Sequence, residues 1–370
     1  MIADSKRFSA YAKAIKKAVR PGDTVLEIGC GPGVFTLVAA QAGARRVYAI
    51  ESDDVINVAR RLAEANGLSE RIEFIQGDSR RVELPERVNV VVADIRGILP
   101  LYDHAVPSIE DARERFLAPG GILIPRRDTL KAAVVDARKD YSRLVRPWQK
   151  TTRGMDFSAS LSPALNEFYS THFRRTQLLT EAESWYTLDY TTSVPRKISR
   201  ELNLRVLRNG MAHGAFVWFE SELFDGIGYS SGAGGATIYG HAFFPWLQPV
   251  KVIEGQEIQI ALHADLVGQD YVWRWETKIP ARDRRPDICF QQSTFQGATF
   301  SPESLRRRAV DYVPVLSDEG QAERWMLGVM DGRTSLQEIA QAATERFPKI
   351  FPSSGDALRL AIELADKLSK

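Results

Sequence analysis

The amino-acid sequence predicts an α/β domain with a parallel sheet, followed by an antiparallel β-barrel and a small, mostly helical domain. Short apolar runs alternate with helical stretches as far as residue 126, a pattern typical of a parallel sheet covered by helices. Period-two and aromatic stretches follow, and amphipathic helical stretches close the chain. We place the three domains at residues 1–126, 127–285 and 310–370, with a connector over 286–309.

The first domain contains the apolar runs that a parallel sheet requires. Its expected strands are Thr24–Ile28, 46–50, Ile72–Gln76, Val88–Ala93 and 121–124. A helical pattern over 55–66 separates the second strand from the third, and a Pro-Gly-Gly turn precedes the last. This order predicts a Rossmann-like domain, in which the ligand lies at the carboxyl ends of the strands.

The second and third domains have different patterns. Alternating apolar residues over 258–262 and the stretch YVWRWETKI over 271–279 are strand-like, while SSGAGGA over 230–236 predicts a flexible loop. Residues 281–310 are rich in arginine and predict a connector with a solvated surface. Helices are expected over 323–330, 335–347 and 357–368, and Ser335 with Glu338 forms the pattern of a capping box.

The composition is that of a globular protein, with 44% hydrophobic and 26% charged residues among 370. The 49 basic and 47 acidic residues give a net charge of +2, which argues against a dedicated nucleic-acid binder. The N-terminus is too charged for a signal peptide, and no run approaches the roughly 20 apolar residues that span a membrane. Cys30 and Cys289 fit a reducing compartment. We therefore expect a cytoplasmic protein with no metal, membrane or nucleic-acid partner.

A glycine-rich loop joins the first expected strand to a helix that begins near residue 34. Its residues are Gly29, Cys30, Gly31, Pro32 and Gly33. Because glycine has no side chain, the backbone can turn sharply here and approach a ligand closely. Dinucleotide-binding enzymes use similar loops, so the loop alone leaves a nicotinamide dinucleotide and S-adenosylmethionine (SAM) as alternative cofactors.

The polar residues around this loop favour SAM. Glu27 lies in the preceding strand, where its carboxylate can reach the methionine part of the ligand. Glu51 follows the second strand and can accept hydrogen bonds from both ribose hydroxyls. Asp78 and Ser79 follow the third strand, where a side chain and a backbone N–H can bind adenine. The E-x-G-x-G-x-G form combined with Asp78 favours SAM over a dinucleotide.

Several motifs within the first 130 residues carry a family resemblance. The stretch VLEIGCGPGVFTLVAAQAGARRVYAIE, the APGG turn at 118–121 and the Ile-Pro pair at 124–125 are similar to segments of the protein arginine methyltransferases. Residues 1–7 resemble the start of that family's cofactor-capping helix, and Arg7 matches the arginine that holds the SAM carboxylate. The resemblance implies SAM as the cofactor and a β-barrel after residue 125.

The same resemblance implies a pair of catalytic carboxylates. The stretch ADIRGILPLYDH over 93–104 matches the family's hairpin loop, with Asp94 and Asp103 in place of two glutamates. Two carboxylates can orient a guanidinium so that one nitrogen faces the methyl group. Because aspartate is shorter by one methylene, the pair could instead hold an imidazole, an amine or an amide, or could be two surface residues.

Two further features of the family have partial matches in the second domain. His241 occupies the place of the histidine in a Thr-His-Trp loop, which implies a role beside the acidic site. The stretch GMDFSA over 154–159 resembles the start of a dimerisation arm, placed near 148–175, and so implies a homodimer. The other histidines are assigned no role; they are His104, His172, His213 and His263.

The C-terminal stretch RWMLGVMDGRTSLQEIAQAATERFP lies outside the arginine methyltransferase pattern. It resembles the small peptide chaperone of pyrroloquinoline quinone biosynthesis, which implies that 310–370 binds a leader peptide. A helical bundle that only stabilises the rest of the chain is the alternative.

Together, these features predict an enzyme, a SAM-dependent N-methyltransferase that acts on a protein or peptide side chain, with arginine as the first candidate. A tailoring enzyme of a ribosomal peptide, acting on histidine, asparagine or an amine, is one alternative. A non-catalytic scaffold with the same fold is the other. The sequence leaves the acceptor atom and the number of methyl groups transferred open.

Overall fold

A computed structural model describes residues 3–149, 154–172, 174–232, 237–281 and 286–369 of the chain. The predicted loop at 230–236, the arginine-rich stretch after 281, the predicted arm near 148–175 and the N-terminal motif each fall partly outside these residues. The chain divides into two compact units, Met1–Thr299 and Phe300–Lys370, and each is described by itself.

A five-stranded sheet forms the first part of the chain, in the order β3–β2–β1–β4–β5, and its paired strands are parallel. The bounds are Thr24–Ile28 (β1), Arg46–Glu51 (β2), Ile72–Gln76 (β3), Val88–Ala93 (β4) and Leu117–Ile124 (β5). The predicted strands and the parallel sheet are therefore confirmed. Strand β5 begins before the predicted residue 121, because Leu117 already pairs with Val88 ahead of the turn.

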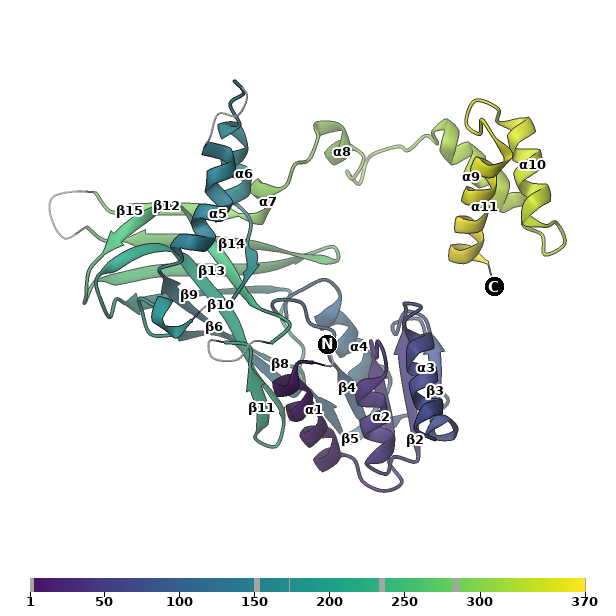
Figure 1. The fold of residues 1–370 in the computed structure, drawn as a ribbon, viewed down its shortest axis with the longest axis horizontal. Coiled ribbons are helices and arrows are strands. Elements are labelled where there is room, and N and C mark those ends of the chain that lie inside the picture. The colour runs from purple at the N-terminus through teal and green to yellow at the C-terminus, as the bar shows by residue number, and fades with distance from the viewer. Residues whose placement is uncertain (1–2, 150–153, 173, 233–236, 282–285, 370) are drawn as a thin grey trace. The chain divides into compact units, whose positions relative to one another are not determined.

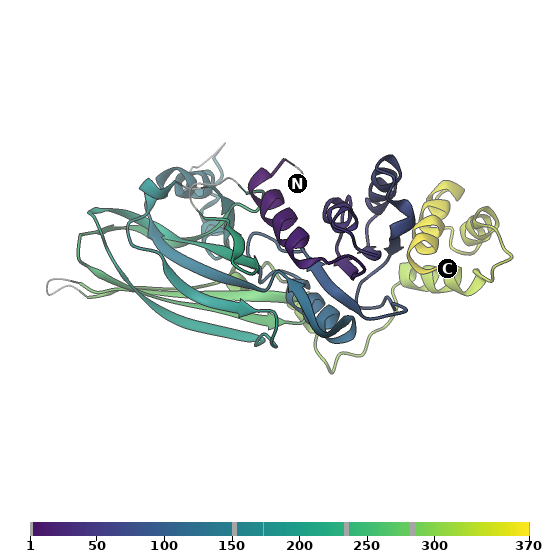
Figure 2. The same ribbon diagram turned by 90° about the horizontal axis from the view of Figure 1, so that it is seen from below.

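Helices lie on both faces of this sheet. Figures 1 and 2 show α1, α2 and α3 on one face and α4 on the other. Their bounds are Ser5–Ala18 (α1), Val34–Gln41 (α2), Ile56–Ala65 (α3) and Ala105–Arg115 (α4). The strand order reverses where β4 pairs with β1, and the crevice at such a switch point is where open α/β sheets bind ligands.

Two antiparallel sheets follow in the same unit. One has the order β7–β12–β10–β6–β8, with β11 paired to β10, and the other has the order β15–β14–β13–β9. The first contains Arg127–Val135 (β6), Tyr169–Thr171 (β7), Glu183–Asp189 (β8), Gly210–Phe224 (β10), Ile227–Ser230 (β11) and His241–Val252 (β12). The second contains Lys197–Arg205 (β9), Glu257–Val267 (β13), Asp270–Ile279 (β14) and Ile288–Ser293 (β15). Short helical segments accompany them: Arg138–Gln149 (α5), Leu161–Leu165 (α6) and Thr294–Gly297 (α7).

The predicted closed barrel is wrong for the residues that the structure describes. The strands at the ends of each sheet pair with one neighbour only, and β8 forms no ladder with β9 in the described chain. A single bridge, Thr180 to Val206, joins the residues just before β8 and just after β9. Aromatic side chains fill the space between the two sheets instead. The ring centroid of Trp273 lies 5.4 Å from that of Trp185 and 5.5 Å from that of Phe244, and all three side chains are almost fully buried. Side-chain packing therefore holds the two sheets together where strand pairing does not.

The stretch that was predicted as a connector, 286–309, contains regular elements, and the helices after it belong to the second unit. Ile288–Ser293 pairs with β14 as β15, because its alternating pattern continues the sheet. The second unit contains Pro302–Arg306 (α8), Asp318–Val329 (α9), Leu336–Arg346 (α10) and Ser354–Leu368 (α11), and the last three helices surround a core of their own. The Ser335–Glu338 capping box forms as predicted. None of the described helices combines the length and apolar character that a membrane span needs.

A buried ion pair joins the parallel-sheet part to the antiparallel sheets. Arg96, in the loop after β4, donates from Nη1 to both carboxylate oxygens of Asp128 in β6, at 2.7 and 2.8 Å, and to Ser221 Oγ in β10 at 2.9 Å. The hydroxyl of Tyr190 donates to Asp128 at 2.8 Å. The Arg96 and Asp128 side chains are 1% and 0% exposed. Because an isolated charge is costly to bury, each of these residues depends on the other.

The substitution Asp128→Ala should lower the free energy of unfolding by about 3–5 kcal/mol, because it leaves the Arg96 guanidinium buried without its main carboxylate. The double variant Arg96→Met/Asp128→Leu should cost less than this single variant, because no unpaired charge remains. Urea denaturation followed by tryptophan fluorescence measures both effects.

Asp265 supplies a matched control, since it pairs with Arg274 at 3.8 Å and its side chain is 26% exposed. Asp265→Ala should cost no more than about 1 kcal/mol. A cost for Asp128→Ala as small as that of the control would refute the proposed dependence on the buried pair.

Candidate functional site

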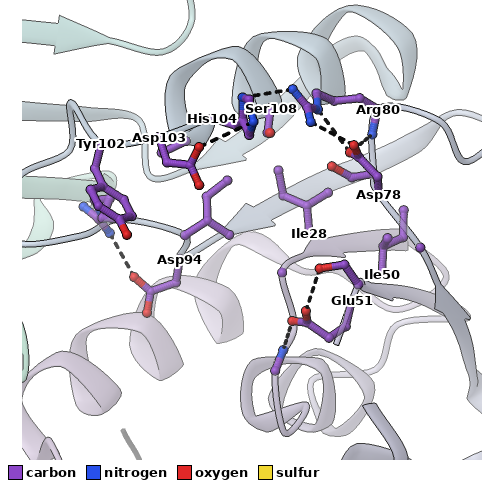
Figure 3. Close-up of a pocket in the computed structure, with 18 residues that line it drawn as sticks. Ile28, Ile50, Glu51, Asp78, Arg80, Asp94, Tyr102, Asp103, His104 and Ser108 are labelled. Carbon is purple, nitrogen blue, oxygen red and sulfur yellow. Dashed lines mark hydrogen bonds and ion pairs between the residues drawn. The ribbon is translucent and has the colours of Figure 1, made fainter. Parts of the chain in front are cut away.

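The main pocket lies at the carboxyl ends of the parallel strands and has a volume of about 490 Å³ (Figure 3). Its walls come from the ends of β1 and β2 and from the segments that follow β3 and β4. The predicted site residues among its lining are Gly29, Gly31, Glu51, Asp78, Ser79, Asp94 and Asp103. Such a volume suits a ligand of the size of a nucleoside derivative.

The glycine loop has left-handed backbone conformations at three positions. Gly29, Gly31 and Gly33 have φ values of 65°, 52° and 74°. A Cβ on Gly29 would lie 2.2 Å from Ile95 Cγ2, and one on Gly33 would lie 2.7 Å from Ala59 Cβ, so both glycines are required for packing. A Cβ on Gly31 would point into open space, which leaves this part of the pocket wall free for a ligand.

Glu51, at the end of β2, folds back against the glycine loop. Its carboxylate accepts hydrogen bonds from the backbone N–H groups of Gly31 at 2.8 Å and Asp53 at 3.0 Å. A carboxylate has about four acceptor sites, so further oxygen lone pairs remain for ligand hydroxyls. The glycine loop and the Glu51 carboxylate therefore hold each other in position.

Asp78 and Ser79 follow β3 and also line the main pocket. Arg80 donates to Asp78 Oδ1 and Oδ2 at 3.1 and 2.8 Å, and these hydrogen bonds lower the pKa of Asp78. Arg115 donates to the Ser79 carbonyl at 2.7 Å and so fixes the backbone of this segment. A charged Asp78 is an acceptor for ligand N–H or O–H groups.

A second, narrow pocket of about 20 Å³ adjoins the main one, since both include Gly29 and Asp94 in their linings. Arg7, Glu27 and Cys30 also line the narrow pocket. The Glu27 carboxyl is buried and accepts a hydrogen bond from the Thr36 hydroxyl; burial raises its pKa to about 8. Burial also raises the pKa of the Cys30 thiol, so this cysteine is not a thiolate nucleophile.

Asp94 is surrounded by internal donors. It forms an ion pair with Arg7 and accepts hydrogen bonds from the hydroxyls of Tyr11, at 3.3 Å, and Tyr239. Arg96 Nη2 lies 3.5 Å from its Oδ1. The Asp94 side chain is 4% exposed, so this carboxylate has a fixed orientation.

Asp103 lies at the other end of the stretch 93–104, which was predicted to carry the acidic pair. Its side chain is 53% exposed, and its backbone has φ 44°, which is uncommon for a residue other than glycine. His104 Nε2 lies 3.4 Å from its Oδ1. The loop therefore brings one buried and one accessible carboxylate to the same pocket.

His241 lines neither of these two pockets. Its Nδ1 lies 3.1 Å from the Thr171 carbonyl, its ring contacts His172, and burial lowers its pKa. Tyr239, two residues earlier, is the residue of this segment that reaches Asp94. A direct contact between His241 and the acidic pair is thus not among the described interactions, and its role beside that pair stays a prediction.

Sequence reasoning missed Tyr11, Arg96, Tyr239 and His104. A signal was present for some of them, because Tyr11 follows Arg7 by one helical turn and His104 is adjacent to Asp103. Tyr239 lies in the turn before β12, and nothing in its local sequence marks it. Within the described part of the chain, no cluster of three metal-ligating side chains is present.

Comparisons with known proteins agree with this geometry. Residues 11–140 match a family model described as ribosomal protein L11 methyltransferase (PrmA). The chain is 35% identical over 166 residues to a probable protein arginine N-methyltransferase 6 of Arabidopsis thaliana, covering 44% of this chain and 38% of that protein. It is 30% identical over 284 residues to a probable histone-arginine methyltransferase CARM1 of Oryza sativa subsp. indica, covering 71% and 53%. The match thus spans about half or less of these relatives' lengths.

Solved structures share the fold of the first unit. The chain matches the Trypanosoma brucei PRMT1 enzyme-prozyme heterotetrameric complex with AdoHcy, with a TM-score of 0.73, 18% identity and coverage of 79% of this chain and 96% of that one. It matches Arabidopsis thaliana protein arginine methyltransferase 10 with a TM-score of 0.70, 22% identity and coverage of 79% and 95%. These findings support a relationship with the class I SAM-dependent methyltransferases. Within that class, these relatives and solved structures are protein arginine methyltransferases.

The substitution Glu27→Gln should change how stability depends on pH. With a pKa of about 8 against an ordinary 4.5, folded Glu27 keeps a proton that the unfolded chain loses. Its contribution therefore makes the free energy of unfolding fall as pH rises from about 5 to 8, on the order of a few kcal/mol. Urea denaturation across this range should show that Glu27→Gln removes this fall. The exposed Glu73→Gln should not, and identical pH dependence in both variants would contradict the assignment.

Proposed function

We propose that this protein is a SAM-dependent N-methyltransferase that transfers a methyl group to an arginine side chain of a protein or peptide. The observation that carries this proposal is the placement of two carboxylates, Asp94 and Asp103, beside adjoining pockets built on the glycine loop. Similarity to the protein arginine methyltransferases supports the same reaction.

The chemistry of the two pockets fits SAM. The main pocket offers Glu51 for ribose hydroxyls, and Asp78 with the Ser79 backbone for adenine. The narrow pocket offers Glu27 for an ammonium group and Arg7 for a carboxylate. A buried carboxyl with a raised pKa is a group that a ligand ammonium would stabilise in its charged form. When bound, SAM supplies a methyl group on a sulfonium, and the leaving group is the neutral thioether S-adenosylhomocysteine.

The protein's part in the reaction is to hold the acceptor nitrogen. Asp94 and Asp103 would accept hydrogen bonds from a guanidinium and so direct one nitrogen toward the methyl group. Arg7 pairs with Asp94 in this structure and also lines the narrow pocket. A ligand carboxylate in that pocket would pair with Arg7. Asp94 would then accept a hydrogen bond from the nitrogen that receives the methyl group.

One observation favours a second candidate acceptor. Two cations, Arg7 and Arg96, already lie beside Asp94. Each of them weakens the attraction between the Asp94 carboxylate and a third cation, such as a substrate guanidinium. An acceptor without charge, such as an imidazole or an amide, is therefore the alternative.

The substitution Asp94→Asn should lower kcat/KM for methylation of an arginine peptide by about a hundredfold or more, because a charge-assisted hydrogen bond is lost. Affinity for S-adenosylhomocysteine should change little. Mass spectrometry of the peptide measures methylation, and calorimetry measures the affinity. Asp265→Asn, in β13, should leave both unchanged.

The proposal fails if the unaltered protein releases no heat with SAM or S-adenosylhomocysteine and methylates no peptide. If Asp94→Asn methylates the peptide as fast as the unaltered protein, Asp94 is not part of the catalytic site. Peptides that present histidine, asparagine or lysine, tested in parallel, separate the alternative acceptors by the mass and position of the product.

We propose further that residues 310–370 capture a segment of the peptide substrate, and that the protein acts as a homodimer. Support for capture comes from the segment between α8 and α9, in which Val310, within a turn, and Val313 and Val315, outside any helix or strand, are 107%, 80% and 85% exposed. An apolar segment whose main chain pairs with no strand of the described chain can add to a peptide strand by main-chain hydrogen bonds. The heterotetramer named for the Trypanosoma brucei structure supports assembly into oligomers.

Deletion of residues 310–370 should weaken binding of a substrate that includes its leader by about tenfold, as fluorescence anisotropy would measure. Affinity for S-adenosylhomocysteine should stay unchanged, because the pocket belongs to the first unit. A short core peptide without the leader serves as the control and should bind the two proteins equally. Equal affinity for the full substrate would instead support a purely structural helical bundle.

A further inference from the structure

A series of polar contacts runs along the wall of the main pocket from Asp78 to Asp103 (Figure 3). Arg80 donates to both carboxylate oxygens of Asp78, and its Nη1 lies 3.1 Å from His104 Nδ1. His104 Nε2 in turn lies 3.4 Å from Asp103 Oδ1. These contacts connect the segment after β3, on the cofactor side, with the accessible carboxylate of the acidic pair.

The donors and acceptors in this series fix the tautomer of His104. A guanidinium has only N–H donors, so the Nδ1 atom that meets Arg80 must carry a lone pair. The proton of the neutral ring is therefore on Nε2, which faces Asp103. His104 accepts from Arg80 on one side, and its protonated Nε2 lies 3.4 Å from Asp103 Oδ1 on the other.

Arg80 is well suited to hold the ring in this orientation. It binds Asp78 in a bidentate manner, which fixes the plane of the guanidinium and raises the pKa of Arg80 while lowering that of Asp78. Both partners therefore stay charged. Because the Arg80 guanidinium plane is fixed, the position of its Nη1 beside His104 Nδ1 is fixed as well.

His104 is also free from the structural role that its position suggests. It is the N-cap residue of α4, but its side chain makes no capping hydrogen bond, and its backbone carbonyl accepts from Ser108 N–H at 2.8 Å. The side chain can therefore be replaced without loss of a cap. Among the described residues, His104 is the side chain seen to contact the half-exposed Asp103.

We propose that His104 is a positioning residue, which holds the Asp103 carboxylate toward the acceptor nitrogen and is itself oriented by Arg80. The inference rests on the proposed function, because it assigns a role within the same acceptor site. Oδ1 of Asp103 lies beside His104 Nε2, and Oδ2 is left to accept a hydrogen bond from the substrate. Without the histidine, an exposed aspartate would sample several rotamers, and fewer of them would face the acceptor.

Two variants of the full-length protein test this. His104→Leu removes both polar contacts, whereas His104→Gln keeps an acceptor for Arg80 and a donor for Asp103. His104→Leu should lower kcat/KM for an arginine peptide about tenfold and weaken peptide binding in the presence of S-adenosylhomocysteine by a similar factor. His104→Gln should recover most of both. Affinity for S-adenosylhomocysteine alone should stay the same in both variants.

His263 is the matched control, because it is a partly exposed histidine in β13 whose Nδ1 lies 2.8 Å from Ser199 Oγ, outside the pocket lining. His263→Leu should leave turnover and peptide binding unchanged. The inference is overturned if His104→Leu equals the unaltered protein, or if His104→Gln is as impaired as His104→Leu. If the unaltered protein neither binds S-adenosylhomocysteine nor methylates a peptide, the proposed function has failed, which is a distinguishable result.

Discussion

The buried pair of Arg96 and Asp128 is the constraint on which the geometry of the site depends. Arg96 lies two residues after Asp94 and is anchored in the antiparallel sheets through Asp128 and Ser221. Its guanidinium also lies over the ring of Phe219 at 5.1 Å, so it is held from several sides. Because this pair limits the positions open to the loop after β4, contacts made outside its own domain contribute to fixing Asp94, in addition to those from Arg7 and Tyr11.

Much of the parallel-sheet part could be predicted from the sequence, because its signals are local. Apolar runs of strand length alternate with helical patterns, and the glycine loop requires backbone conformations that its residues allow. Strand β5 shows the limit of this reasoning. A Pro-Gly turn predicts the end of regular pairing, yet Leu117 pairs with Val88 before the turn, a contact that depends on the neighbouring strand.

The closure of the barrel and the surroundings of Asp94 could not be predicted, because both depend on contacts between distant segments. Alternating residues predict strands but do not say whether β8 and β9 share hydrogen bonds or only pack through aromatic side chains. Tyr239 reaches Asp94 across 145 positions of sequence, and the resemblance drew attention to His241 instead.

The left-handed backbone at Asp103 bears on how this site could have diverged from its relatives. Aspartate and asparagine adopt this conformation more readily than longer residues, because their short side chains bond to the local backbone. A glutamate at this position would extend farther, but it would cost on the order of 1 kcal/mol in backbone conformation. The shorter acid is therefore tied to the shape of its loop. Replacement of this aspartate by glutamate would therefore change the backbone preference of the loop as well as the reach of the carboxylate.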